Sequence, residues 1–165
     1  MTTDKTYSAM VELDEAVKAA AIDLPSTGEP LTDDTLIVHL GLEGVQSLCH
    51  GLAAHSGWWI DLETGEDVRT WPKKFLNLWI ASKLMLTVTE LAEAMEGLRK
   101  DLPDDKLPHR KMLEVEMADA VIRIFDLSGG LGFDLAGAII EKLAFNQSRA
   151  DHKLDNRAAA GGKSI

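Results

Sequence analysis

Residues 72–100 read PKKFLNLWIASKLMLTVTELAEAMEGLRK, and this stretch decides the fold. Pro72 suits the first turn of a helix, and no helix breaker follows it before Gly97. Apolar residues recur at intervals of four, three, four and three, at Leu84, Val88, Leu91, Met95 and Leu98. This spacing is typical of one apolar face of a helix. The stretch therefore predicts a long helix with an apolar stripe along one side.

The segments before this helix predict further helices and a loop. Residues 5–22 are rich in alanine and predict a peripheral helix, and residues 24–30 (LPSTGEP) predict a linker. A helix is expected over about 33–54, after a capping cluster at 32–34. Residues 57–71 contain a Thr-Gly turn and several strand-forming residues, which predicts a loop or a small hairpin before the long helix.

Two helices are expected after the long one. A helix over about 110–128 carries a second apolar stripe, at Val115, Ala118, Ile122 and Phe125. Residues 129–133 (GGLGF) predict a turn, and Asp134 is a suitable cap for a helix that continues to about 151. Because no strand–helix alternation and no repeat is visible, the prediction is an all-α bundle of four to five helices.

Length and composition indicate one soluble domain. The chain has 165 residues, of which 45% are hydrophobic and 27% are charged, as in ordinary globular proteins. We place the domain at 31–155, with an arm at 1–30 and a flexible tail at 156–165. Cys49 is the only cysteine, which excludes an internal disulfide and a zinc cluster made of cysteines.

The charge balance narrows the expected partners and location. A net charge of −10 argues against binding to nucleic-acid polymers, which normally requires a basic surface. Neither a signal peptide nor an uncharged apolar run of about 20 residues is visible, so we expect no membrane partner and a cytoplasmic location.

Two pairs of acidic residues flank the apolar stripes. Glu90 and Glu93 lie three apart on the long helix, and Glu116 and Asp119 repeat this spacing on the next one. Antiparallel packing of the two helices would bring the four carboxylates together, where each pair would repel by on the order of 4 kcal/mol. A hard divalent cation removes that penalty, so the pattern predicts Mg²⁺, with Mn²⁺ as a substitute. Solvated acidic faces are the alternative.

A cationic face is expected on the last helix. Its members are spaced four, three and four apart, and they are Lys142, Asn146, Arg149 and Lys153. Such a face opposite an acidic metal site would suit a polyphosphate, because cations neutralise the charge that shifts during P–O cleavage. The alternative is that these side chains form salt bridges between neighbouring helices.

The ordered motifs resemble a known family. Glu90-Leu-Ala-Glu93, a spacer of 22 residues, and Glu116-Met-Ala-Asp119 are similar to the ExxE…ExxD signature of the MazG-like, all-α nucleoside triphosphate pyrophosphohydrolases. The resemblance extends from about Gly57 to Lys153. It implies that the four acids bind Mg²⁺ and that a nucleoside triphosphate is cleaved to the monophosphate and pyrophosphate. It also implies a homodimer or homotetramer.

This resemblance implies roles for individual residues. Glu93 or Glu90 would orient or deprotonate the attacking water. The phosphates would be bound by Lys83, Lys142, Asn146 and Arg149. Three tryptophans could stack on the base or anchor the core, namely Trp58, Trp59 and Trp79. Two other functions stay open: a non-catalytic acidic interaction protein with the same fold, and a hydrolase of another pyrophosphate such as phosphoribosyl-ATP or an alarmone.

Overall fold

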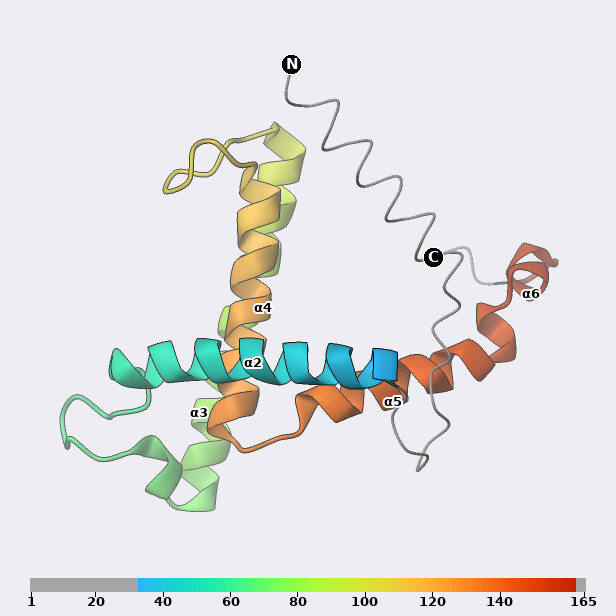
Figure 1. Cartoon of the computed structure of the whole chain (residues 1–165). Coiled ribbons are helices and arrows are strands. Elements are labelled where there is room, and N and C mark those ends of the chain that lie inside the picture. Colours follow the sequence, from blue (N-terminus) through green and yellow to red (C-terminus); the bar gives the residue numbers. More distant parts are fainter. Residues whose placement is uncertain (1–32, 163–165) are drawn as a thin grey trace. The chain divides into compact units, whose positions relative to one another are not determined.

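The computed structural model describes residues 33–162, which are helical and contain no strand (Figure 1). The α-helices are α2 (Asp33–His55), α3 (Lys73–Lys100), α4 (Met112–Gly130), α5 (Leu135–Ser148) and α6 (Leu154–Ala158). Short 3₁₀ turns lie at Val68–Thr70 and Ala150–His152. The predicted all-α class is thus confirmed. The helix expected at 5–22 and the linker at 24–30 lie outside the described residues.

The described chain divides into two compact units, which we treat separately. The central unit is Gly41–Leu135, and it contains most of α2 together with α3 and α4. The terminal unit comprises the described parts of Met1–Leu40 and Ala136–Ile165. It therefore contains the beginning of α2, α5 from Ala136 onward and all of α6.

Helices α3 and α4 pack along each other and form the framework of the central unit (Figure 1). The faces that meet are built from small and acidic residues. Gly97 is essential to this approach, since a Cβ there would lie only 2.8 Å from the Cβ of Met112. The residues of α3 that become buried are Thr87, Glu90, Ala94 and Gly97. Those of α4 are Glu116, Ala120, Phe125, Leu127 and Ser128.

The loop between α3 and α4 is fixed by backbone and side-chain hydrogen bonds. Asp101 ends α3 in the left-handed region (φ 51°), and its N–H donates to the carbonyls of Gly97 and Leu98. Its carboxylate pairs with Lys111 at 2.6 Å. The buried carboxylate of Asp104 accepts the N–H groups of the two residues at 106 and 107. This loop therefore sets the register in which α4 returns along α3.

The apolar stripe predicted along α3 is not buried within the described chain. Its five residues are between 49% and 65% exposed, because α4 packs on the neighbouring face of small and acidic residues. The predicted stripe thus lies on a face of α3 that the described residues leave open. Among the described helices, α3 is long and apolar enough to cross a membrane by length and composition only. Core helices of soluble proteins and signal sequences meet the same criterion.

Several element boundaries differ from the prediction. Helix α4 continues through Gly129 and Gly130 instead of ending at 128, and α5 ends at Ser148 instead of near 151. Of the two expected forms of 57–71, a loop or a small hairpin, the structure has a loop with one bridge, between Ile60 and Asp67, followed by the first 3₁₀ turn. Part of the tail predicted to be flexible forms α6.

Gly130 lies in the last turn of α4, and an indole ring occupies the space where a side chain would lie. A Cβ at this position would come within 2.0 Å of the Trp59 ring. That ring is 1% exposed and donates a hydrogen bond, so it has little freedom to move away. The glycine therefore serves close packing here, and the turn starts only after it.

We predict that Gly130→Ala lowers the free energy of unfolding by about 1 to 3 kcal/mol through overpacking against Trp59. Gly44→Ala is the matched control, because Gly44 lies within α2 and no atom lies within 4 Å of a Cβ there. The control should leave the stability unchanged or raise it by up to about 1 kcal/mol. Urea unfolding followed by circular dichroism measures both, and equal stabilities would contradict the packing argument.

Candidate active site

Three of the four predicted carboxylates converge between α3 and α4. Glu90 comes from α3, whereas Glu116 and Asp119 come from α4, and their ligand oxygens lie within 4.8 Å of one another. Glu90 is 7% exposed and Glu116 is 4% exposed. Glu116 and Asp119 are three apart on α4 and both face Glu90 on α3, so the packing of the two helices brings the three carboxylates together. We call these three residues the acidic triad.

Glu93 lies beside the acidic triad and is exposed. It is one turn after Glu90 on α3, and its charge still acts on Glu116, whose pKa it helps to raise. The structure thus places three of the predicted acids in one group and the fourth at its solvent side.

The acidic triad is electrostatically strained. The pKa of Glu116 is raised to about 7, first by burial, then by a hydrogen bond with Glu90 and by repulsion from the three other acids. An ordinary glutamate is fully ionised at neutral pH. The triad therefore favours either a proton or a cation among its oxygens.

Arg123 contacts the acidic triad and was not singled out from the sequence. Its guanidinium lies 2.6 Å from the Oε1 atom of Glu90, in an ion pair between α4 and α3. The signal was present in the spacing, since Arg123 follows Asp119 by four residues and therefore shares its helical face. The acids could be predicted because they form a motif, whereas a single arginine does not.

A cavity of about 270 Å³ opens beside the acidic triad. Asp119 belongs both to its wall and to the acidic triad, and Arg123, which pairs with Glu90, also lines the wall. Its wall combines apolar surface with two cationic and two acidic side chains. The lining residues are Ala53, Trp58, Lys83, Leu86, Asp119, Ile122, Arg123 and Asp126.

Lys83 projects from α3 into the wall of this cavity, between two indoles. Its Nζ atom lies 4.9 Å from the ring centre of Trp79 and 5.4 Å from that of Trp58. Burial lowers the pKa of Lys83, an effect that Asp126 opposes and Arg123 reinforces. The predicted phosphate-binding residue Lys83 is therefore at the cavity, where an anion would compensate its charge.

The two adjacent tryptophans have opposite positions. Trp58 is 66% exposed and lines the cavity, whereas Trp59 is buried against α4. The Nε1–H of Trp59 donates to Asp126 Oδ1 at 2.7 Å, and the Nδ1 atom of His50 lies 3.1 Å from the same oxygen. Trp59 thus has the position of a core anchor, and Trp58 that of a residue open to a ligand.

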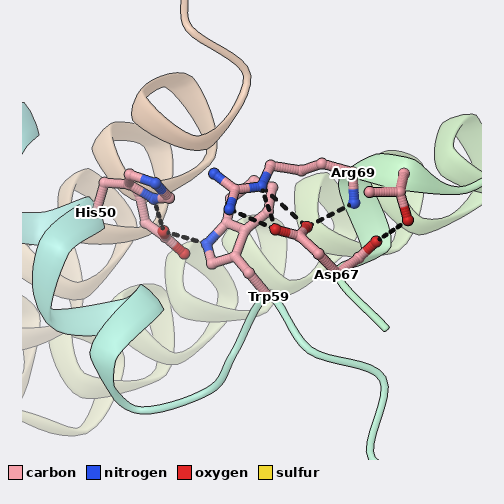
Figure 2. A network of polar contacts seen from close by, with 6 residues as sticks. His50, Trp59, Asp67 and Arg69 are labelled. Carbon is pink, nitrogen blue, oxygen red and sulfur yellow. Dashed lines mark hydrogen bonds and ion pairs between the residues drawn. The ribbon is translucent and has the colours of Figure 1, made fainter. Parts of the chain in front are cut away.

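The loop before α3 is held by a second polar contact on the other side of Trp59. Asp67 caps the 3₁₀ turn, and its carboxylate forms an ion pair with Arg69 (Figure 2). The guanidinium of Arg69 lies 5.4 Å from the Trp59 ring centre. Hydrogen bonding from Arg69 keeps the pKa of Asp67 below its usual value. These contacts fix the segment that carries Trp58.

The other three phosphate-binding candidates belong to the terminal unit, with Lys142 and Asn146 on α5 and Arg149 just after its end, so the predicted helical face does not extend to Arg149. Lys142 lies 4.7 Å from the Phe145 ring, and Arg149 pairs with Asp151 at 2.6 Å. The Oδ1 atom of Asn146 is buried and has no hydrogen-bond partner among the described residues. Their predicted role beside the acids stays a prediction, because the two units are described separately.

Comparison with known proteins adds no relative. No family model matches the chain, and no curated protein and no solved structure is similar to it. A function is therefore inferred from the ordered acidic motifs and from the geometry of the central unit.

We predict that Glu116→Gln stabilises the metal-free protein at alkaline pH. A carboxyl group whose pKa is raised in the folded state makes the folded protein less stable as the pH increases. The loss occurs between the group's pKa in the unfolded chain, 4.5, and its pKa in the folded protein, about 7. The neutral amide avoids this loss, so the gain should be on the order of 1 to 3 kcal/mol near pH 8 and smaller near pH 5.

Thermal unfolding in the presence of a chelator measures this difference. Glu114→Gln is the control, because Glu114 is exposed on the same helix and forms a surface ion pair with Arg110. It should change the melting temperature little at either pH. A Glu116→Gln variant that is less stable at pH 8 than the unmodified protein would contradict the repulsion argument.

Proposed function

We propose that this protein is a Mg²⁺-dependent nucleoside triphosphate pyrophosphohydrolase, which releases a nucleoside monophosphate and pyrophosphate. The observation that carries the proposal is the acidic triad beside a cavity that contains Lys83 and Arg123. Carboxylates that gather a divalent cation next to cationic side chains suit a polyphosphate substrate.

The residues present fit Mg²⁺ or Mn²⁺. The donor set consists of carboxylate oxygens, which hard divalent cations prefer. A bound cation would also relieve the repulsion between carboxylates that helps to raise the pKa of Glu116. Glu90, Glu116 and Asp119 would hold the ion, with Glu93 available at the solvent side.

The bound ion would neutralise phosphate oxygens and polarise the phosphorus under attack. The protein's own groups would do the rest. Glu93, which is exposed beside the triad, would orient the attacking water and take its proton on a carboxylate oxygen. Lys83 would bind phosphate oxygens from the cavity wall, and Trp58 would stack on the base. Lys142, Asn146 and Arg149 remain candidates for further phosphate contacts.

We also propose that the protein works as a cytoplasmic homodimer or dimer of dimers. The uncovered stripe of α3 is the supporting observation, because large contiguous apolar surfaces on a water-soluble chain usually belong to an interface. A second copy of the chain would offer the same stripe and could cover it through a symmetric contact.

A panel of nucleoside triphosphates with Mg²⁺ and a pyrophosphate assay tests the activity. We expect Glu90→Gln, Glu93→Gln and Asp119→Asn to reduce turnover by about 100-fold or more while the helical signal in circular dichroism is kept. Glu96→Gln is the control, because Glu96 lies on the same helix but pairs with Arg99 at the surface.

Each outcome of this assay has a distinct meaning. Full activity in two of the three variants would refute the assignment of the acidic residues. Turnover of a different pyrophosphate alone would move the proposal to that substrate class. The absence of turnover with every compound would favour the non-catalytic interaction protein.

We predict that Leu91→Asp shifts the protein towards the monomer, because a buried charge in the stripe would lack a partner. Leu62→Asp is the control, since Leu62 lies in the loop before α3 and is 93% exposed. Light scattering at micromolar concentration measures both variants. A monomeric unmodified protein would refute the proposed assembly.

A further inference from the structure

We propose that Arg123 and the divalent cation compete for Glu90, and that cation binding releases Arg123 to bind the substrate's phosphates. This inference rests on the proposed function, because it assigns Arg123 as the residue that couples the metal site to the phosphate site. Three observations carry it: the ion pair with Glu90, the unused donor of the guanidinium, and the position of Arg123 in the cavity wall.

The ion pair places Arg123 on a carboxylate that a metal ion would use. Arg123 lies 2.6 Å from Oε1 of Glu90, whose side chain is 9% exposed. The same carboxylate supplies one of the three ligand oxygens of the acidic triad. A divalent cation on this carboxylate would repel the guanidinium and so weaken its contact with Glu90.

The charges favour such an exchange. Three carboxylates with one guanidinium leave a net negative charge, whereas a divalent cation brings two positive charges to the same place. The ion pair stabilises the charged form of Glu90 but lowers the affinity for the cation, because the cation has to displace a positive charge that already lies at this carboxylate. Arg123 thus behaves as an internal competitor of the metal ion.

The guanidinium is only partly satisfied by the protein. Its Nε–H is buried and has no hydrogen-bond partner in the described chain. Arg123 thus keeps one donor that no described group of the protein uses. Arg123 also lines the cavity together with Lys83 and Asp119.

A released Arg123 would meet phosphate oxygens in that cavity. The planar guanidinium donates two parallel hydrogen bonds to a phosphate, which a lysine cannot reproduce. Metal and phosphate would then favour each other's binding, since the cation frees the group that binds the phosphate. By linkage the effect is reciprocal, so a phosphate ligand should raise the affinity for the cation.

The test is isothermal titration of Mn²⁺ and of pyrophosphate into the full chain. We expect Arg123→Gln to bind Mn²⁺ about tenfold more tightly without pyrophosphate and to bind pyrophosphate about tenfold more weakly with Mn²⁺. In the unmodified protein pyrophosphate should tighten Mn²⁺ binding, and in Arg123→Gln this coupling should disappear. Arg99→Gln is the control, because it removes the same charge from an exposed Arg–Glu pair on α3.

A second variant keeps the test decisive if Arg123→Gln does not fold. Arg123→Lys retains the charge but loses the bidentate geometry, so pyrophosphate binding and its coupling to Mn²⁺ should weaken. Unchanged coupling in this variant would overturn the proposal.

Two results separate this proposal from the proposed function. Mn²⁺ binding that is lost in Glu90→Gln but unchanged or weaker in Arg123→Gln would overturn the role of Arg123 and leave the metal site intact. Mn²⁺ binding to neither the unmodified protein nor Arg123→Gln would overturn both.

Discussion

The burial of acidic side chains between two closely packed helices is the constraint on which the central unit depends. Small residues such as Ala94 and Gly97 let α4 approach α3, and this approach removes Glu90 and Glu116 from water. Buried carboxylates are costly unless they gain a proton, a cation or hydrogen bonds. Apolar residues of similar volume at these positions would avoid that cost.

The cavity depends on a second arrangement, in which Trp59 connects the loop before α3 to α4. Its indole fills the space above Gly130 and donates to Asp126, which also lies beside His50. Because Asp126 is itself part of the cavity wall, the anchor and the wall share one carboxylate. The loop that carries Trp58 and Trp59 is thereby placed against α4, which carries two of the three triad acids.

The sequence predicted the helices and the acidic residues because both depend on local spacing. The periodicity of 72–100 predicted α3, and the two motifs on successive helices predicted that Glu90, Glu116 and Asp119 would meet. The face of α3 that is buried could not be predicted in this way. Hydropathy pointed to the leucine stripe, whereas the contact with α4 uses residues of low hydropathy whose advantage is their small size. The roles of Arg123 and Asp126 depend on partners more than 30 residues away, as the Arg123–Glu90 pair shows, and spacing within one helix does not reveal such partners.

The two adjacent tryptophans, which are two of the four in the chain, lie in opposite environments. Trp59 is enclosed and held by Asp126, so its emission should lie at short wavelength, as expected for an indole shielded from water. Trp58 faces solvent at the cavity and has the ammonium of Lys83 near its ring, so its emission should lie at longer wavelength and respond to whatever enters there. The tryptophan emission of the chain should therefore combine a component from the interior with one from the cavity, alongside the signals of Trp71 and Trp79.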